Sequence, residues 1–122
     1  MAFLNDDVKD DGLQVLTDAT STALHICSQE PTTRTEAVTT YTLGNKSSPT
    51  IGSPTDGDSS GRKVVVSAIT DGTVTGTDTA THWAVIDGTR LLATNSLSSG
   101  QAVTSGNTFT LGAIDITIPD PA

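Results

Sequence analysis

The stretch THWAVIDGTRLLATNSL, residues 81–97, carries the clearest structural signal in the chain. Two runs rich in β-branched, aromatic and aliphatic residues, 81–86 and 91–97, stand on either side of the dipeptide Asp87-Gly88. Asp-Gly suits a turn with positive φ, and this dipeptide between two short apolar runs is typical of a β-hairpin. The stretch therefore predicts two adjacent antiparallel strands.

Similar short runs follow one another about every ten positions from residue 23 onward, a spacing typical of a sandwich or barrel. Asp71-Gly72 is predicted to form a second hairpin turn. The segment 44–61 contains Pro49, Pro54 and several Gly and Ser residues, which predicts an excursion loop with a short edge strand around Thr50 and Ile51. The predicted strands are 23–28, 39–43, 62–69, 73–79, 81–86, 91–97 and 107–118.

The last of these runs changes its pattern half-way. Phe109 and Leu111 share one parity, whereas Ile116 and Ile118 share the other. Strict alternation cannot bury both sets on one face of a strand. A β-bulge near Gly112 is predicted, because one extra residue swaps the parity.

Residues 1–20 differ from the rest, since they contain five aspartates and few threonines. The spacing of Leu4, Val8, Val15 and Ala19 is compatible with a short amphipathic helix, which Gly12 interrupts. We therefore predict a mostly β protein. A short N-terminal helix or arm occupies 1–20, and a single antiparallel β-sandwich or jelly-roll-like barrel occupies 21–122.

The charge balance excludes some classes of partner. The chain has 14 acidic and 6 basic residues, with a formal net charge of −8, and the bases are dispersed except for one pair. Affinity for nucleic acid comes from clustered Lys and Arg, so no nucleic-acid partner is expected, and anionic membranes are disfavoured for the same reason. No segment approaches the roughly 20 apolar residues of a membrane span.

Cys27 is the only cysteine, so the fold uses no intrachain disulfide, and synthesis in a reducing cytoplasm fits. Cys27 and His25 alternate on one face of a predicted strand, but a thiol nucleophile also needs a base within reach and a third group to orient that base. Both are interpreted as packing residues. Trp83 is interpreted as a core residue rather than an interface anchor.

The best candidate for a metal-binding segment contains Asp56, Asp58 and Ser60. Oxygen ligands at alternate positions precede Gly61 there, as in a calcium loop. The twelfth position of such a loop would be Ser67 rather than a bidentate Glu, and a strand rather than a helix follows. An acidic turn is favoured over a bound metal. No motif for a nucleophile, a phosphate or a dinucleotide is present, so we predict no enzyme, no catalytic residue and no cofactor.

Five segments resemble small structural proteins of tailed bacteriophages, and among these the capsid decoration, or cement, proteins are closest. The segments are CSQEPTT at 27–33, TTYTLG at 39–44, SGRKV at 60–64, ATHWAV at 80–85 and SGNTFT at 105–110. The resemblance implies a virion protein that binds the outer capsid surface and reinforces contacts between major capsid protein subunits. It brings no active residues with it.

Under that role, Phe3, Leu4 and Val8 are expected to anchor the N-terminal arm on the capsid or on a neighbouring copy. The expected partner is the phage major capsid protein, together with further copies of this chain, and the expected location is the capsid surface. Two alternatives stay open. One is a tail-fibre or spike adhesin module that binds a host glycan or receptor, and the other is a head-tail joining or tail-terminator protein.

Overall fold

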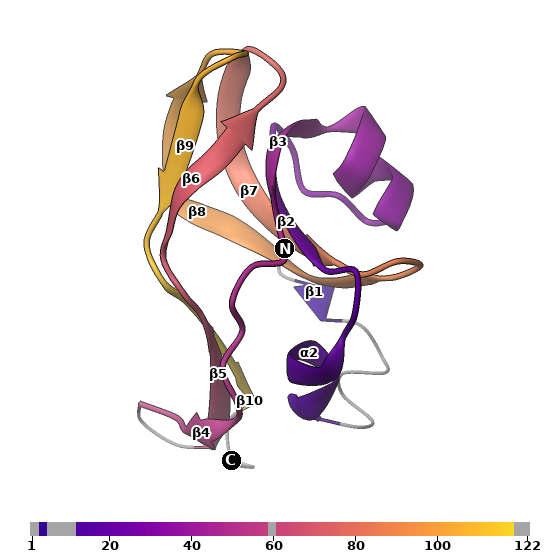
Figure 1. The fold of residues 1–122 in the computed structure, drawn as a ribbon, viewed down its shortest axis with the longest axis vertical. Coiled ribbons are helices and arrows are strands. Elements are labelled where there is room, and N and C mark those ends of the chain that lie inside the picture. Colours follow the sequence, from indigo (N-terminus) through magenta and orange to yellow (C-terminus); the bar gives the residue numbers. More distant parts are fainter. Residues whose placement is uncertain (1–2, 5–11, 59–60, 119–122) are drawn as a thin grey trace.

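A computed structural model describes residues 3–4, 12–58 and 61–118 of the chain. In these residues, ten strands form two antiparallel sheets, and the helical segments are short. The larger sheet curls strongly into a half-barrel. Figure 1 shows it in the upper part of the molecule, with the smaller sheet below. The predicted mostly β fold is confirmed.

The larger sheet has the strand order β1-β8-β7-β2-β3-β6-β9. Its strands are β1 (Phe3–Leu4), β8 (Leu91–Val103), β7 (Asp78–Ile86), β2 (Ala23–Cys27), β3 (Thr42–Ser47), β6 (Ile69–Val74) and β9 (Thr108–Leu111). The smaller sheet has the order β10-β5-β4. Its strands are β10 (Ile114–Ile118), β5 (Arg62–Val66) and β4 (Thr55–Asp56). The helical segments are α2 (Gln14–Asp18) and the π-helical turn η1 (Glu36–Thr40).

The predicted hairpin around Asp87-Gly88 is confirmed. Strands β7 and β8 pair antiparallel, with Val85 opposite Ala93. The glycines with positive φ among the described residues are Gly12, Gly61 and Gly106. The turn therefore does not depend on a left-handed glycine at position 88.

The predicted turn at Asp71-Gly72 is wrong, because both residues lie inside β6. Gly72 stands opposite Phe109 in β9, and a Cβ atom at position 72 would collide with the Phe109 ring. Glycine is thus required by close packing between strands rather than by a turn. The chain reverses instead after Val74, so the predicted strand 73–79 is divided, and 81–86 is part of the longer β7.

The predicted strand 39–43 is also wrong in its first half. Residues Glu36–Thr40 form η1, and β3 begins only at Thr42. The amide of Glu36 donates to Thr33 Oγ1, while the Glu36 carboxylate accepts from the amide of Thr32. Side-chain bonds to free backbone amides stabilise the first turn of a helix.

Strand β3 continues to Ser47, so the predicted loop 44–61 begins later than expected. At the expected short edge strand around Thr50 and Ile51, the structure has an isolated antiparallel bridge between Ile51 and Val66 rather than a strand. Short strand β4 follows before the chain enters β5. The segment is thus partly ordered by pairing with β5.

Two predicted strands are each divided between the two sheets. The run 62–69 becomes β5 in the smaller sheet and the start of β6 in the larger one, and 107–118 becomes β9 and β10. The predicted bulge near Gly112 is therefore wrong, although the change of parity that motivated it is real. Phe109 and Ile116 are both buried, each beneath a different sheet.

The N-terminal segment joins the main core. Leu16 on α2 is only 1% exposed and packs with buried residues of both sheets. A second, smaller cluster lies between the sheet and the η1 segment, where Cys27 and Ala37 are fully buried. Figure 1 shows η1 and α2 on the same side of the half-barrel, η1 beside β3 and α2 lower down.

Candidate functional site

The paired strands β7 and β8 form a ribbon with two different ends. At one end is the tight turn at Asp87. At the other, Ala80 pairs with Gln101 and His82 with Ser96, so the four residues 97–100 lie opposite Thr81 alone. This wide bulge pushes the chain outward and leaves Ser98 and Ser99 exposed.

The bulge forms one wall of an open groove of about 490 Å³, which we call the β8–β9 groove. Residues 96–101 line it from β8, and residues 110–114 line it from the end of β9 and the start of β10. Trp83, which is 7% exposed, lies at the bottom. The groove therefore occupies the gap where the curled sheet fails to close.

A hydrogen bond crosses this gap. Gln101 Nε2 donates to the main-chain oxygen of Thr110 at 3.3 Å. Because β9 pairs on its other side with β6, the Gln101 amide satisfies part of an edge that no strand covers within the described residues. Gln101 thereby holds the two walls of the groove together at one end.

Within the described residues, the lining of the groove is uncharged. It combines the hydroxyls of Ser96, Ser98 and Ser99 and the amide of Gln101 with apolar side chains such as Leu97. Such a surface can form hydrogen bonds and pack against carbon, but it offers no titratable group for acid-base chemistry. The groove thus offers hydrogen-bonding groups and apolar surface to a bound molecule.

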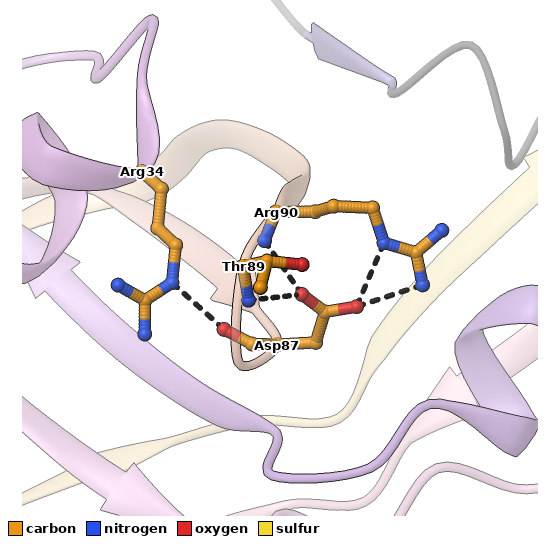
Figure 2. Close-up of polar contacts among 4 residues, drawn as sticks. All are labelled: Arg34, Asp87, Thr89 and Arg90. Atoms are coloured by element: carbon orange, nitrogen blue, oxygen red, sulfur yellow. Dashed lines mark hydrogen bonds and ion pairs between the residues drawn. The ribbon is translucent and has the colours of Figure 1, made fainter.

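The opposite end of the ribbon is held by charges (Figure 2). Asp87 Oδ1 accepts hydrogen bonds from the amides of Thr89 at 2.9 Å and Arg90 at 2.6 Å. Asp87 Oδ2 accepts from Arg90 Nε at 2.8 Å and lies 2.7 Å from a terminal nitrogen of the same guanidinium. Arg34 approaches from the other side and donates from Nε to the Asp87 carbonyl at 2.8 Å.

This network explains why the turn needs no positive φ, because the Asp87 side chain bonds the following amides itself. Burial acts to raise the pKa of Asp87, but the hydrogen bonds from Thr89 and Arg90 outweigh it and hold the pKa below its ordinary value. The carboxylate is therefore charged at neutral pH. The carboxylate stabilises the turn, and the main-chain carbonyl of Asp87 joins the turn, through Arg34, to the segment that leads into η1.

His25 and Cys27 lie in the core, as expected for packing residues. His25 Nδ1 lies 2.8 Å from Thr42 Oγ1, and burial, together with the nearby charge of Arg34, lowers the pKa of His25 to about 4. Burial raises the pKa of the Cys27 thiol to about 12, and its Sγ donates weakly to the Ala37 carbonyl. A neutral imidazole bonded elsewhere and a protonated thiol do not form a nucleophilic pair.

The segment with the metal candidates is held by ion pairs. Asp56 Oδ1 lies 2.7 Å from Arg62, and Asp58 Oδ1 lies 2.5 Å from Lys63, which also contacts Asp115 at 3.2 Å. Ser60 lies outside the described residues. Within the described part of the chain, no three His, Cys, Asp or Glu side chains gather where a metal ion could be held.

The three expected anchor residues are placed only in part. Phe3 and Leu4 form β1, which pairs with Thr94 and Ala93 of β8 in the same chain. Val8 lies outside the described residues. The role of the three as an interface stays a prediction.

The β8–β9 groove was not predicted from the sequence. The predicted strand 91–97 ended where the bulge begins, although β8 continues to Val103. The stretch Ser98-Ser99-Gly100 indicates an irregularity in a strand, but it does not show which distant segment faces it. That information depends on how far the sheet curls.

Comparisons of the chain with known protein families, with curated proteins and with solved structures give no match. Over the described residues, the structure contains no helix of the length and apolar character needed to cross a bilayer. The surfaces and side chains described above are thus the observations that bear on function.

Proposed function

We propose that this protein is a non-enzymatic virion structural protein of the capsid decoration type. It binds the outer surface of a tailed-phage head and reinforces contacts between subunits of the major capsid protein. It is made in the host cytoplasm and resides on the capsid surface. The sequence resemblance suggests this role, and the form of the smaller sheet supports it.

The observation that carries the proposal is the uncovered edge of β10. Strand β10 pairs with β5 in regular register from Ile114 to Ile118, and no described strand pairs with its other side. A regularly paired strand with one unpaired edge presents main-chain N–H and C=O groups that can receive a strand from another protein. On a symmetric shell, many such modest contacts add to a large collective stabilisation.

The charge of the chain is compatible with this location. A net charge of −8 keeps the protein soluble and repels packaged DNA. The ion pairs of Asp56 and Asp58 lie in the same small sheet as β10 and hold its other strands together. These ion pairs therefore stabilise the small sheet that carries the unpaired edge of β10.

Location and copy number test the proposal directly. We expect labelled antibody to mark the head of purified virions, and the copy number to be on the order of hundreds per particle, as for a component repeated over a symmetric shell. Labelling of the tail, or a copy number near that of a single ring, would refute the proposal.

The binding edge is tested by adding purified protein back to heads that lack it. Thr117→Lys places a charge on β10, which should discourage strand addition and reduce occupancy of the heads. Thr73→Lys is the matched control, because Thr73 is also exposed but lies in β6 between two paired strands. Equal occupancy of the two variants would count against the β10 edge.

Phe3, Leu4 and Val8 remain the proposed anchor of the N-terminal arm. Deletion of residues 1–12 is expected to lower occupancy on purified heads. Thermal melting of the deletion variant is the control, since β1 also pairs within the chain. Full occupancy after the deletion would remove the arm from the proposal.

A second candidate function is an adhesin module in a tail fibre or spike. The uncharged β8–β9 groove favours it, because such a surface suits a host glycan. The antibody experiment separates the two candidates, since the adhesin requires the tail tip and decoration requires the head.

A further inference from the structure

We propose that the β8–β9 groove is a binding site for a neutral saccharide. The inference stands on the groove itself and holds whether the protein is located on the head or on the tail of the virion. It assigns a ligand class to a surface that capsid binding through β10 does not use.

The groove has a suitable size. Its volume of about 490 Å³ lies within the range of roughly 300–1,000 Å³ found for sites that hold small organic ligands. The Gln101–Thr110 hydrogen bond closes the gap at one point, and the bulge at residues 97–100 bends the β8 wall. A compact ligand therefore fits better than a peptide strand, which needs a straight edge.

Charge restricts the ligand to a neutral molecule. None of the described side chains that line the groove is ionisable, although the chain as a whole carries 20 charged Lys, Arg, Asp and Glu residues. An anionic ligand would find no cation in the groove and would meet the field of a protein with net charge −8. A cationic ligand would find no carboxylate, so either charge would lose hydration without an ion pair.

The polar groups of the groove match a ligand rich in hydroxyls. Ser96, Ser98 and Ser99 each offer a hydroxyl that both donates and accepts hydrogen bonds, and all three are exposed. The bulge brings Ser98 and Ser99 into the same lining, whereas residues adjacent in a regular strand face opposite sides. Their hydroxyls are thus available to one ligand.

The apolar groups supply the remaining contact. Leu97, Leu111 and Ile114 are partly buried against the core and still line the groove, with Trp83 beneath them. A sugar ring presents C–H faces between its hydroxyls, and these faces gain free energy by leaving water. The combination of apolar walls and hydroxyls is what a neutral saccharide requires.

The test is a titration of the intact protein with three trisaccharides. Maltotriose and triacetylchitotriose are the neutral probes, and sialyllactose is the acidic probe of similar size. Trp83 is the only tryptophan, so its fluorescence reports on the groove, and amide shifts in nuclear magnetic resonance spectra locate the contact. We expect at least one neutral probe to shift both signals and sialyllactose to bind more weakly.

Two variants test the site itself. Ser98→Ala combined with Ser99→Ala removes two hydroxyls and should weaken binding by about fivefold or more, as expected for lost hydrogen bonds. Gly112→Trp should abolish binding, because a Cβ at Gly112 meets no heavy atom within 4 Å and the new ring can fill the groove. Binding to this variant is followed by amide shifts alone, since its second tryptophan also fluoresces. The matched control is Ser47→Ala with Ser67→Ala, two exposed serines outside the groove lining, which should bind as the parent does.

Four outcomes would overturn the proposal. The first is that neither neutral probe shifts the groove signals, and the second is that sialyllactose binds as well as they do. The third is that binding persists in Gly112→Trp or is unchanged by the paired serine substitutions. The fourth is that the groove signals change with protein concentration alone, which would make a second copy of the chain the occupant.

Discussion

The two ends of the β7–β8 ribbon are built from the same pair of strands but by opposite means. At the hairpin end, the Asp87 carboxylate receives four contacts from Thr89 and Arg90. Arg34 donates a hydrogen bond to the main-chain carbonyl of the same residue. At the groove end, residues 97–100 bulge away from Thr81, and no charged side chain among the described residues lines the wall. At the hairpin end, charged groups fix the backbone. At the groove end, the uncharged lining leaves a surface for a neutral partner.

The physical reason is the cost of burying a charge. Asp87 is 6% exposed, so its carboxylate must be fully bonded, and the bonds that satisfy it also define the turn. The serines of the bulge can exchange water for a ligand at small cost. We expect substitutions at the hairpin end to affect folding and those at the groove end to affect binding.

The largest effect is expected from Asp87→Ala. This change removes the two hydrogen bonds that the Asp87 carboxylate accepts from the amides of Thr89 and Arg90, and it leaves the Arg90 guanidinium without its partner. The free energy of unfolding should fall by about 2–3 kcal/mol. Urea denaturation measures the loss as a lower midpoint with an unchanged slope. Asp71→Ala is the charge-matched control, because the exposed Asp71–Lys46 pair should contribute less than about 1 kcal/mol. Equal losses would show that the hairpin end has no special role.

The next effect is a dependence of stability on pH through His25. Its pKa is about 4 in the folded protein, against an ordinary value of 6.5, so the unfolded chain binds more protons between these values. The contribution of a neutral His25 to the free energy of unfolding is therefore complete above the ordinary pKa and is lost as the pH falls toward the folded pKa. The expected loss is about 2 kcal/mol between about pH 7 and about pH 5.

His25→Gln is the control for this effect, because glutamine can still bond Thr42 but does not titrate. The difference in unfolding free energy between the two pH values should shrink in the variant. The hairpin network stays ionised across this window, since hydrogen bonds from Thr89 and Arg90 hold the pKa of Asp87 low against burial. If parent and variant show the same pH dependence, His25 is not the titrating group.

A comparable or smaller loss is expected from Gly72→Ala at the pairing of β6 with β9, which supports the far wall of the groove. The added methyl would collide with the buried ring of Phe109, and such overpacking costs roughly 1–3 kcal/mol. Gly112→Ala is the control, because its Cβ meets open space. Thermal melting of the two variants compares them, and a similar melting temperature for both would contradict the packing of Phe109 on Gly72.

The smallest effect is expected from Ser98→Ala combined with Ser99→Ala. Both side chains are exposed, so the free energy of unfolding should change by less than about 0.5 kcal/mol per substitution. A larger loss in urea denaturation would mean that the bulge stabilises the fold, and the contrast between the two ends would disappear.

The sequence is most informative where strands are adjacent in the chain. The β7–β8 hairpin followed from two apolar runs around Asp87-Gly88, and the short edge pairing of Ile51 followed from a Pro- and Gly-rich segment. The start of η1 could also have been found, because Thr33 and Glu36 stand at capping-box spacing. At the end of η1, the β-branched Thr39 and Thr40 favoured the predicted strand 39–43 instead.

The groove and the division of strands between sheets were beyond such reasoning. Gly72 has the sequence context of a turn, and only the ring of Phe109, 37 positions away, makes it a packing residue. The parity change at Gly112 was visible, but a bulge and a move to another sheet leave the same pattern in the sequence. Which of the two occurs depends on the curl of the larger sheet.

By itself, then, the sequence determined the mostly β fold, the Asp87 turn and the burial of His25, Cys27 and Trp83, because alternation and turn chemistry act over neighbouring residues. The tertiary structure alone decided that residues 96–101 face residues 110–114 and that the space between them carries no charge. Those segments meet only because the half-barrel stops short of closing, and closure is a property of all seven strands together.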